Sequence, residues 1–264
     1  MRIVWLSANL FGYELLKEVL KIKGVEIVAI ITLNDKSKTN MYDGIERNRW
    51  YDFNIPVYEI ENINNEIKLL KSLHPDIAIV CGWRQMINKG ILDIPTKGVI
   101  GFHPTLLPKG RGPAPIINTI LEGYKKSGVT MFYLNEKVDA GDIIGQVEFD
   151  ISEEDYAVDI YRKIIRGGKR LLRKYLPLLI EGNAPGVPQD EKGATYFRKI
   201  TLKDNEINLD KDSPGEISKK IRAFSYPYLG AYIKVKDKFL VIWKGEVIDA
   251  KKWRENIGNS PTSR

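Results

Sequence analysis

A histidine at the end of a predicted strand is the residue whose position most clearly suggests chemistry. Residues 98–102 are Gly-Val-Ile-Gly-Phe, an apolar run that predicts a buried strand, and His103-Pro104 ends it. Ligands of a parallel sheet bind beyond the carboxyl ends of its strands, so we expect His103 at a binding site. Because an imidazole titrates near neutral pH, it is well suited to proton transfer. The prolines and glycines of residues 104–115 predict an irregular loop, with a helix beginning near Ala114.

A second segment supplies a carboxylate that can act with this histidine. Residues 128–134 predict a strand, residues 139–142 (Asp-Ala-Gly-Asp) a short loop, and residues 143–149 the returning strand. If the strands are neighbours, Asp139 and His103 could lie within hydrogen-bond distance, where the carboxylate would orient the imidazole and favour its charged form. Considered alone, these residues support a catalytic His103 and a structural strand-end histidine about equally.

Elements that position these residues are visible in the alternation of apolar and amphipathic segments. Residues 25–32 show almost no polar alternation, as expected of a strand covered on both faces. The succession of strands and helices predicts an α/β fold with a doubly wound, mostly parallel sheet. Residues 7–12 contain no Gly-x-Gly-x-x-Gly, so a dinucleotide site has no support. The predicted strands are residues 2–6, 25–32, 56–58 and 76–81, and the predicted helices are residues 10–21, 63–73, a short one ending at 92, and 157–179.

The composition shifts after the long predicted helix, which indicates two unequal domains. We expect a main domain at residues 1–185, a linker around residues 182–193 and a small C-terminal α+β module at residues 194–257. In that module we expect a helix at residues 214–224, paired strands at 231–235 and 239–243, and a disordered tail at 258–264. The polar segment 34–54, with a short helix around 44–50, is either a mobile loop beside the site or a plain surface excursion.

Composition excludes several classes of protein. With 264 residues, 43% of them hydrophobic, the chain can bury a full core, yet it has no run of about 18 apolar residues and no signal-peptide pattern. Its single cysteine, Cys81, lies in an apolar run and suits a reducing cytoplasm, so we expect a cytoplasmic protein without membrane association. The formal charge of +7 permits anionic ligands. The sequence has no cluster of histidines and cysteines, so we do not expect a metal site.

Several motifs resemble one enzyme family. The segments HPTLLPKGRG, GVT and VDAGDIIGQ are similar to those of the formyltransferases that use 10-formyltetrahydrofolate, as are VCGWRQMI, TYFRKIT and RAFSYPYLGAY. That group includes methionyl-tRNA formyltransferase, glycinamide ribonucleotide transformylase and the sugar N-formyltransferases. The resemblance covers most of the chain and implies a Rossmann-like formyltransferase fold. It also implies transfer of a formyl group to a primary amine.

The resemblance assigns roles to particular residues. His103 and Asp139 match the catalytic histidine and aspartate of the family. The pterin ring of the donor is expected in a slot formed by Gln85, Met86, Ile87, Val138, Asp139, Gly141 and Asp142. For the acceptor we expect contacts from Asn9, Phe11, Gly12, Thr105, Arg111 and Gly112. Arg111 suits an anion because its planar fork makes charge-assisted hydrogen bonds, although it could equally pin the loop to an acidic neighbour.

One position departs from the family pattern. Two residues before the histidine the family usually has an asparagine whose amide donates to the oxyanion, and this chain has Gly101. Losing such a donor costs about 10²–10³ in rate. Another donor could substitute, with Arg84, Gln85 and Asn118 as candidates, or the glycine could admit a water or backbone donor. A third explanation is a non-catalytic folate- or nucleotide-binding protein. We favour an enzyme, and expect Gly101→Asn to fold and to preserve or raise the rate.

Among acceptors we prefer a nucleotide-linked amino sugar, with methionyl-tRNA as the alternative. The TYFRKIT and RAFSYPYLGAY segments are similar to the sugar N-formyltransferase arrangement, which has a small C-terminal unit. The lysines of residues 199–238 are interleaved with acids, whereas a tRNA-binding surface would be more uniformly basic. A glycinamide ribonucleotide acceptor is less favoured, because enzymes of that type generally lack the second module. The sequence leaves open whether the chain forms a homodimer.

Overall fold

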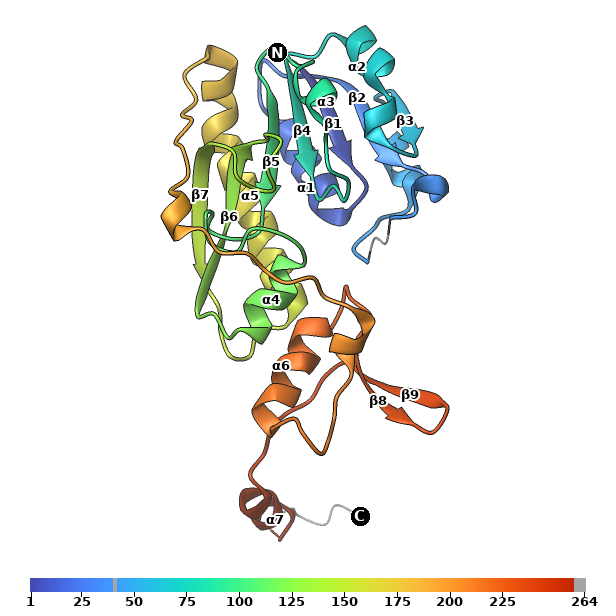
Figure 1. Cartoon of the computed structure of the whole chain (residues 1–264), viewed down its shortest axis with the longest axis vertical. Coiled ribbons are helices and arrows are strands. Elements are labelled where there is room, and N and C mark those ends of the chain that lie inside the picture. Colours follow the sequence, from blue (N-terminus) through green and yellow to red (C-terminus); the bar gives the residue numbers. More distant parts are fainter. Residues whose placement is uncertain (40–41, 259–264) are drawn as a thin grey trace.

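The computed structural model describes residues 1–39 and 42–258. Its main element is a seven-stranded sheet with the order β3-β2-β1-β4-β5-β6-β7 (Figure 1). The first five strands in this order run parallel, and β6 and β7 join antiparallel. The expected doubly wound, mostly parallel sheet is therefore confirmed. The strands are β1 (Arg2–Ser7), β2 (Glu26–Leu33), β3 (Val57–Ile60), β4 (Ile77–Cys81), β5 (Val99–His103), β6 (Lys126–Tyr133) and β7 (Ile143–Asp150).

Helices cover both faces of this sheet, which creates two hydrophobic cores. In β1, Ile3 and Trp5 enter the core beneath α1 and α5, while Val4 and Leu6 enter the core beneath α2. Burial on both faces explains why the central strands lack polar alternation. The α-helices are α1 (Leu10–Val19), α2 (Ile67–Leu73), α3 (Lys89–Leu92), α4 (Pro115–Leu121), α5 (Ala157–Glu181), α6 (Pro214–Phe224) and α7 (Ala250–Gly258). Short 3-10 helices lie at Asp35–Ser37, Arg47–Phe53, Ile63–Asn65, Glu191–Gly193 and Leu202–Asn205.

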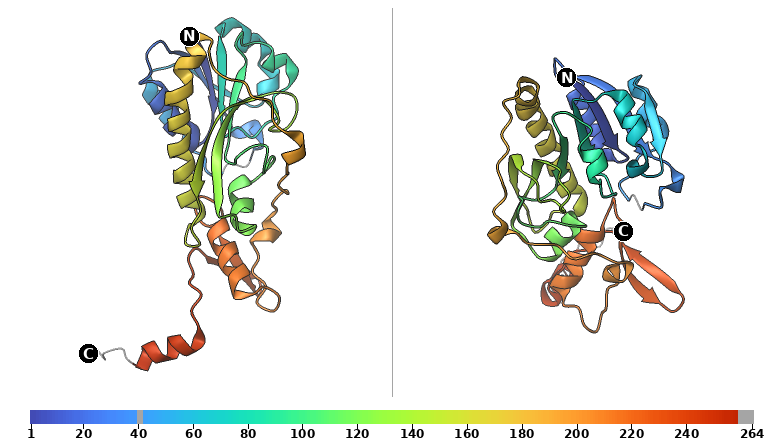
Figure 2. Two further views of the ribbon diagram at one scale, coloured as in Figure 1. Left: turned by 90° about the vertical axis from the view of Figure 1, so that its left-hand side faces the viewer. Right: turned by 45° about the horizontal axis from the view of Figure 1, so that its top comes forward.

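The 25-residue helix α5 lies along one face of the sheet and contacts α1, β6 and β7 (Figure 2). Gly167 allows this close approach, because a Cβ atom there would lie 2.5 Å from Cγ1 of Val129 in β6. The helix therefore packs directly against β6. Since β6 pairs with β5, which carries His103, α5 helps to fix the strand that presents the histidine.

The chain returns along the sheet after α5 and then forms the smaller C-terminal part. Residues 183–198 form the connecting segment, which includes most of the linker expected at residues 182–193. Its end pairs with the loop that follows β5: the Arg111 N–H donates to Thr195 O, and the Phe197 N–H donates to Arg111 O. Helix α6 then packs on α4, and β8 (Ala231–Val235) and β9 (Lys238–Ile242) form a two-stranded hairpin.

The C-terminal end differs from the expectation in one respect. Residues 250–258 form α7, which sequence patterning did not predict and which Figure 1 shows apart from the rest of the chain. Gly258, expected to begin a disordered tail, is the last residue of this helix, and residues 259–264 lie outside the described residues. None of the helices in the described ranges has both the length and the apolar character needed to cross a bilayer.

The close approach of α5 predicts a stability effect. In Gly167→Val, the added side chain overlaps Val129 and should lower the free energy of unfolding by about 1–3 kcal/mol. Gly215→Val in α6 is the matched control, because a Cβ atom at residue 215 would have no atom within 4 Å among its neighbours in the fold. Thermal unfolding followed by circular dichroism measures both. Equal losses in the two variants would contradict tight packing of α5 on the sheet.

Candidate active site

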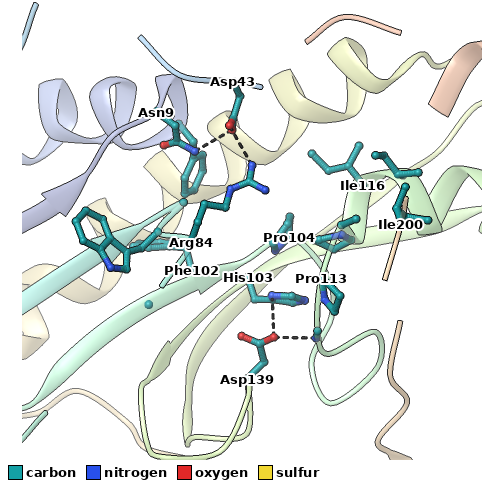
Figure 3. A pocket seen from close by; sticks show the side chains of 18 of the residues that line it. Asn9, Asp43, Arg84, Phe102, His103, Pro104, Pro113, Ile116, Asp139 and Ile200 are labelled. Atoms are coloured by element: carbon teal, nitrogen blue, oxygen red, sulfur yellow. Dashed lines mark hydrogen bonds and ion pairs between the residues drawn. The ribbon is translucent and has the colours of Figure 1, made fainter. Parts of the chain in front are cut away.

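His103 and Asp139 meet at the carboxyl end of β5. Nδ1 of His103 lies 3.4 Å from Oδ2 of Asp139, and Nε2 lies 2.8 Å from the carbonyl oxygen of Gly110. The Asp139 oxygen also accepts a hydrogen bond from the Gly112 N–H at 2.8 Å (Figure 3). The side chain of His103 is 7% exposed and that of Asp139 22% exposed, so the carboxylate is the more accessible partner.

These contacts favour one imidazole tautomer. A carbonyl oxygen only accepts hydrogen bonds, and the Gly110 oxygen is the closer of the two acceptors that face the ring, so neutral His103 is expected to carry its proton on Nε2. Nδ1 then has a free lone pair. A proton taken up at Nδ1 would lie beside Oδ2 of Asp139, whose negative charge stabilises the imidazolium. The pair is therefore arranged as a base that can receive a proton.

The loop after His103 is held by a small buried network. Thr130 of β6 donates its hydroxyl to Thr105 O at 2.7 Å and accepts the Leu107 N–H at 3.1 Å. Gly110 has a positive φ of 69°, and a Cβ atom there would lie 2.6 Å from Cε2 of Phe197. Glycine is therefore required where the loop turns its carbonyl toward His103.

Arg111 was expected to contact an anionic ligand, and the structure corrects this. The residue is fully buried, and its guanidinium donates to both oxygens of Glu191, to Oε1 of Gln189 and to the Tyr196 hydroxyl. The guanidinium lowers the pKa of the Glu191 carboxyl from its usual value. Gln189 in turn donates to Asp139 O and Gly141 O. Arg111 thus pins the loop to an acidic neighbour and supports the Asp139 loop indirectly.

His103 and Asp139 face a cavity of about 610 Å³ between the sheet and the C-terminal part. Seven more of the predicted site residues line it: Asn9, Phe11, Gln85, Met86, Ile87, Gly112 and Val138. Met86 and Val138 are apolar yet 58% and 45% exposed. Together with Ile87 and Leu134 they form an apolar wall that fits a flat ring system.

Five predicted site residues do not line this cavity. Besides Arg111, they are Gly12, Thr105, Gly141 and Asp142. Gly12 packs α1 on β1, since a Cβ atom would lie 2.0 Å from Oγ of Ser7, and Gly141 packs against the Tyr133 carbonyl in the same way. Thr105 is buried and donates its hydroxyl to Lys109 O. These residues shape the backbone around the site, and Asp142 is exposed outside it.

Sequence reasoning missed a polar cluster on the cavity wall. Asp43, from the polar 34–54 segment, accepts hydrogen bonds from Asn9 Nδ2 at 2.8 Å, the Tyr161 hydroxyl at 2.8 Å and Arg84 Nη2 at 3.0 Å. Burial raises the pKa of Tyr161 and of Tyr228, and the charge of Asp43 adds to both shifts. The only sequence signal for Asp43 was the length of its loop. The Asp43 contacts bind that loop to the site.

Space near Gly101 is filled by Leu134. A Cβ atom at Gly101 would lie 2.2 Å from Cδ1 of Leu134. The substitution Gly101→Asn therefore requires the Leu134 side chain to move, which the sequence alone did not indicate. Two of the candidate substitute donors are engaged elsewhere: the amide nitrogen of Gln85 donates to Glu61 O and that of Asn118 to three carbonyls. Arg84 is directed toward Asp43.

Comparison with known proteins identifies the family. The Formyl transferase family profile matches residues 1–176, and the profile of the formyl transferase C-terminal domain matches residues 199–262. The chain belongs to the formyl transferase family. As a formyltransferase of this family it uses 10-formyltetrahydrofolate as donor.

Curated relatives agree with this family, and solved structures share the fold. This chain is 33% identical over 257 residues to the methionyl-tRNA formyltransferase of Halalkalibacterium halodurans. The aligned region covers 96% of this chain and 80% of the relative. The chain is 35% identical to that of Geobacillus thermodenitrificans, covering 94% and 78%. A sugar N-formyltransferase from a Shewanella species has the same fold, with a TM-score of 0.74, 18% identity, and 94% and 99% coverage.

Across residues 1–39 and 42–258, no three or more His, Cys, Asp or Glu side chains are placed to hold a metal ion. His74, the second histidine, caps the C-terminal end of α2 in a left-handed conformation and lies outside the cavity.

The role of Arg111 predicts a selective loss of activity. In Arg111→Met, Gln189 loses its hydrogen-bond donor and the Asp139 loop loses support, so kcat should fall about tenfold. The KM for the acceptor should stay within about twofold of the wild type, because Arg111 does not line the cavity. Steady-state kinetics measures both. A large rise in acceptor KM at constant kcat would instead show direct substrate contact.

Proposed function

We propose that this formyltransferase transfers the formyl group to the α-amino group of methionyl-tRNA. The observation that supports this most directly is the similarity to methionyl-tRNA formyltransferases over almost the whole chain, at 33–35% identity. These relatives favour methionyl-tRNA over the amino sugar that sequence motifs suggested. The surplus of basic residues, with a formal charge of +7, is compatible with a polyanionic acceptor.

In this reaction 10-formyltetrahydrofolate supplies the formyl carbon. His103 Nδ1 accepts the proton that the attacking amine loses, and Asp139 stabilises the resulting imidazolium across 3.4 Å. The Gly110 carbonyl holds Nε2, so the ring keeps its orientation while the proton moves. The same nitrogen can return the proton to the leaving group. Met86, Ile87, Leu134 and Val138 hold the donor ring against this pair.

Apolar side chains on the other side of the cavity fit a methionine side chain. Ile116 and Ile117 of α4, Ile164 of α5 and Phe224 of α6 all line it. Figure 3 shows Ile116 and Ile200 on the same side of the cavity, away from Asp43. A thioether side chain is apolar and flexible and would fill such a surface, whereas a sugar ring needs polar partners.

A nucleotide-linked amino sugar is the second candidate acceptor. Solved structures similar to this chain include a sugar N-formyltransferase that the match covers almost entirely. The polar cluster of Asn9, Asp43 and Arg84 would offer hydrogen-bonding partners to sugar hydroxyls. We assign the order of the two candidates from sequence identity, which is higher for the methionyl-tRNA enzymes.

A comparison of acceptors tests the proposal. With 10-formyltetrahydrofolate, the wild-type protein should formylate methionyl-tRNA with a kcat/KM at least about 10²-fold above that for any dTDP- or UDP-linked amino sugar. His103→Ala should lower the rate on the preferred acceptor by about 10²–10⁴. His74→Asn is the matched control and should keep full activity, since asparagine tolerates the left-handed conformation at that cap.

Release of tetrahydrofolate and formylated product measures each reaction. Turnover with an amino sugar but not with methionyl-tRNA would transfer the assignment to the second candidate. If neither acceptor is formylated and the protein binds folate tightly, the result would favour the explanation of Gly101 as a feature of a non-catalytic binding protein.

A further inference from the structure

Arg84 is held at the cavity wall in a way that leaves part of its guanidinium available. Its Nη2 donates to Oδ1 of Asp43 at 3.0 Å, and this is the only hydrogen bond of its side chain to residues 1–39 and 42–258. The Arg84 side chain is 36% exposed and lines the cavity, while that of Asp43 is 7% exposed. Figure 3 shows the guanidinium beside Asp43, in a cluster separate from His103 and Asp139.

The position of Arg84 is fixed from behind. Asp43 also accepts hydrogen bonds from Asn9 and Tyr161, and the Tyr161 hydroxyl accepts the Phe11 N–H at 3.0 Å. The carboxylate is thus tied to the start of α1 and to α5. Because these supports are buried, Asp43 cannot swing away, and it holds one edge of the guanidinium while the other N–H groups remain unengaged.

Tyr228 contributes a second unengaged donor. It lines the same cavity from the C-terminal part, and its hydroxyl makes no hydrogen bond to any residue in the described ranges. Its ring packs edge-on against that of Tyr42 at 6.2 Å. Burial raises the pKa of Tyr228, so the hydroxyl stays protonated and can donate. Two side chains that line one cavity, each with donor groups unpaired within the described residues, indicate a ligand group that accepts hydrogen bonds.

We propose that Arg84 and Tyr228 bind a phosphate group of the formyl acceptor, with Asp43 as the residue that positions Arg84. This inference rests on the proposed function, since both candidate acceptors, the 3′ end of a tRNA and a nucleotide sugar, carry phosphate near the reacting amine. A phosphate matches the planar fork of a guanidinium and accepts a tyrosine hydroxyl at the same time.

The arrangement favours the acceptor over the donor. The wall expected to hold the donor ring comes from Met86, Ile87, Leu134 and Val138, next to Asp139. Arg84 instead belongs to the cluster built on Asp43 and Asn9, which Figure 3 shows apart from His103 and Asp139. An amine at His103 and a phosphate at Arg84 would therefore place the acceptor across the cavity, with the donor on the remaining side.

Charges around the cavity add to the attraction. Asp43 offsets the charge of Arg84, while Lys137 and Lys199 also line the cavity and are exposed at its rim. The acidic groups that line it are Asp43 and Asp139. Three cationic side chains against two carboxylates leave the cavity favourable to an anion, so a phosphate is drawn in at low ionic strength.

The kinetic test uses Arg84→Gln and Tyr228→Phe. Losing the charged hydrogen bonds of Arg84 should raise the acceptor KM about 10- to 100-fold, and losing the Tyr228 hydroxyl about 2- to 10-fold. The KM for 10-formyltetrahydrofolate and kcat should stay within about twofold, because binding common to ground and transition state affects KM alone. Arg47→Gln is the matched control: Arg47 lies in the 34–54 segment that also carries Asp43, pairs with Asp35 and Glu59, and does not line the cavity.

Phosphate-free acceptors identify the group that is recognised. Methionine methyl ester, and the amino sugar without its nucleotide, should give the same KM with wild type and Arg84→Gln. An unchanged KM for the phosphate-bearing acceptor in Arg84→Gln would overturn the inference, as would an equal rise in KM for the phosphate-free ones. Thermal unfolding shows whether each variant is folded. If Arg84→Gln does not fold, the KM of Tyr228→Phe still tests the inference.

Binding of inorganic pyrophosphate, measured by calorimetry, separates this inference from the proposed function. Wild type and Arg47→Gln should bind pyrophosphate equally, and Arg84→Gln about tenfold or more weakly. If no acceptor is formylated but this difference is found, the phosphate site stands and the proposed function fails. If pyrophosphate binds wild type and Arg84→Gln alike, the phosphate site is refuted whatever the acceptor.

Discussion

The Asp139 carboxylate joins the two loops on which this active site depends. One oxygen faces Nδ1 of His103 at 3.4 Å and accepts the Gly112 N–H at 2.8 Å, so it connects the loop after β6 to the loop after β5. Asp139 itself has a φ of 49°, a left-handed conformation that few residues other than glycine adopt, although aspartate adopts it more often than most. Such a backbone persists only where its surroundings enforce it, and here the enforced position is the one that faces the imidazole.

The connecting segment supplies that enforcement from the outside. Gln189 donates to the carbonyls of Asp139 and Gly141, and Arg111 holds Gln189 while remaining completely buried. The segment therefore couples the position of the carboxylate to the packing of the chain between the sheet and the C-terminal part. An arginine surrounded by glycines in a loop looks like a ligand-binding residue from its sequence. Its partners lie about eighty residues away, and only the fold brings them together.

Local patterns predicted the sheet, α6 and the His103–Asp139 pair because each depends on short-range signals. Apolar runs, a proline after His103 and a family motif are all readable along the chain. Asp43 was not predictable in this way, since its role arises from Asn9, Tyr161 and Arg84, which come from three distant elements. The steric role of Leu134 over Gly101 likewise depends on strand register. The sequence also does not show which side chains near the site line the cavity and which, such as that of Thr105, do not.

The tautomer of His103 tests the central geometry most directly. The chain has two histidines, so ¹⁵N NMR of histidine-labelled protein gives two imidazole spin systems, and His74→Asn assigns them. Because Nε2 lies 2.8 Å from the Gly110 carbonyl oxygen, which only accepts hydrogen bonds, the account predicts that neutral His103 carries its proton on Nε2 and leaves Nδ1 without a proton beside Asp139. A neutral His103 protonated on Nδ1 would contradict it, since the ring could not then receive a proton at the position that faces the carboxylate.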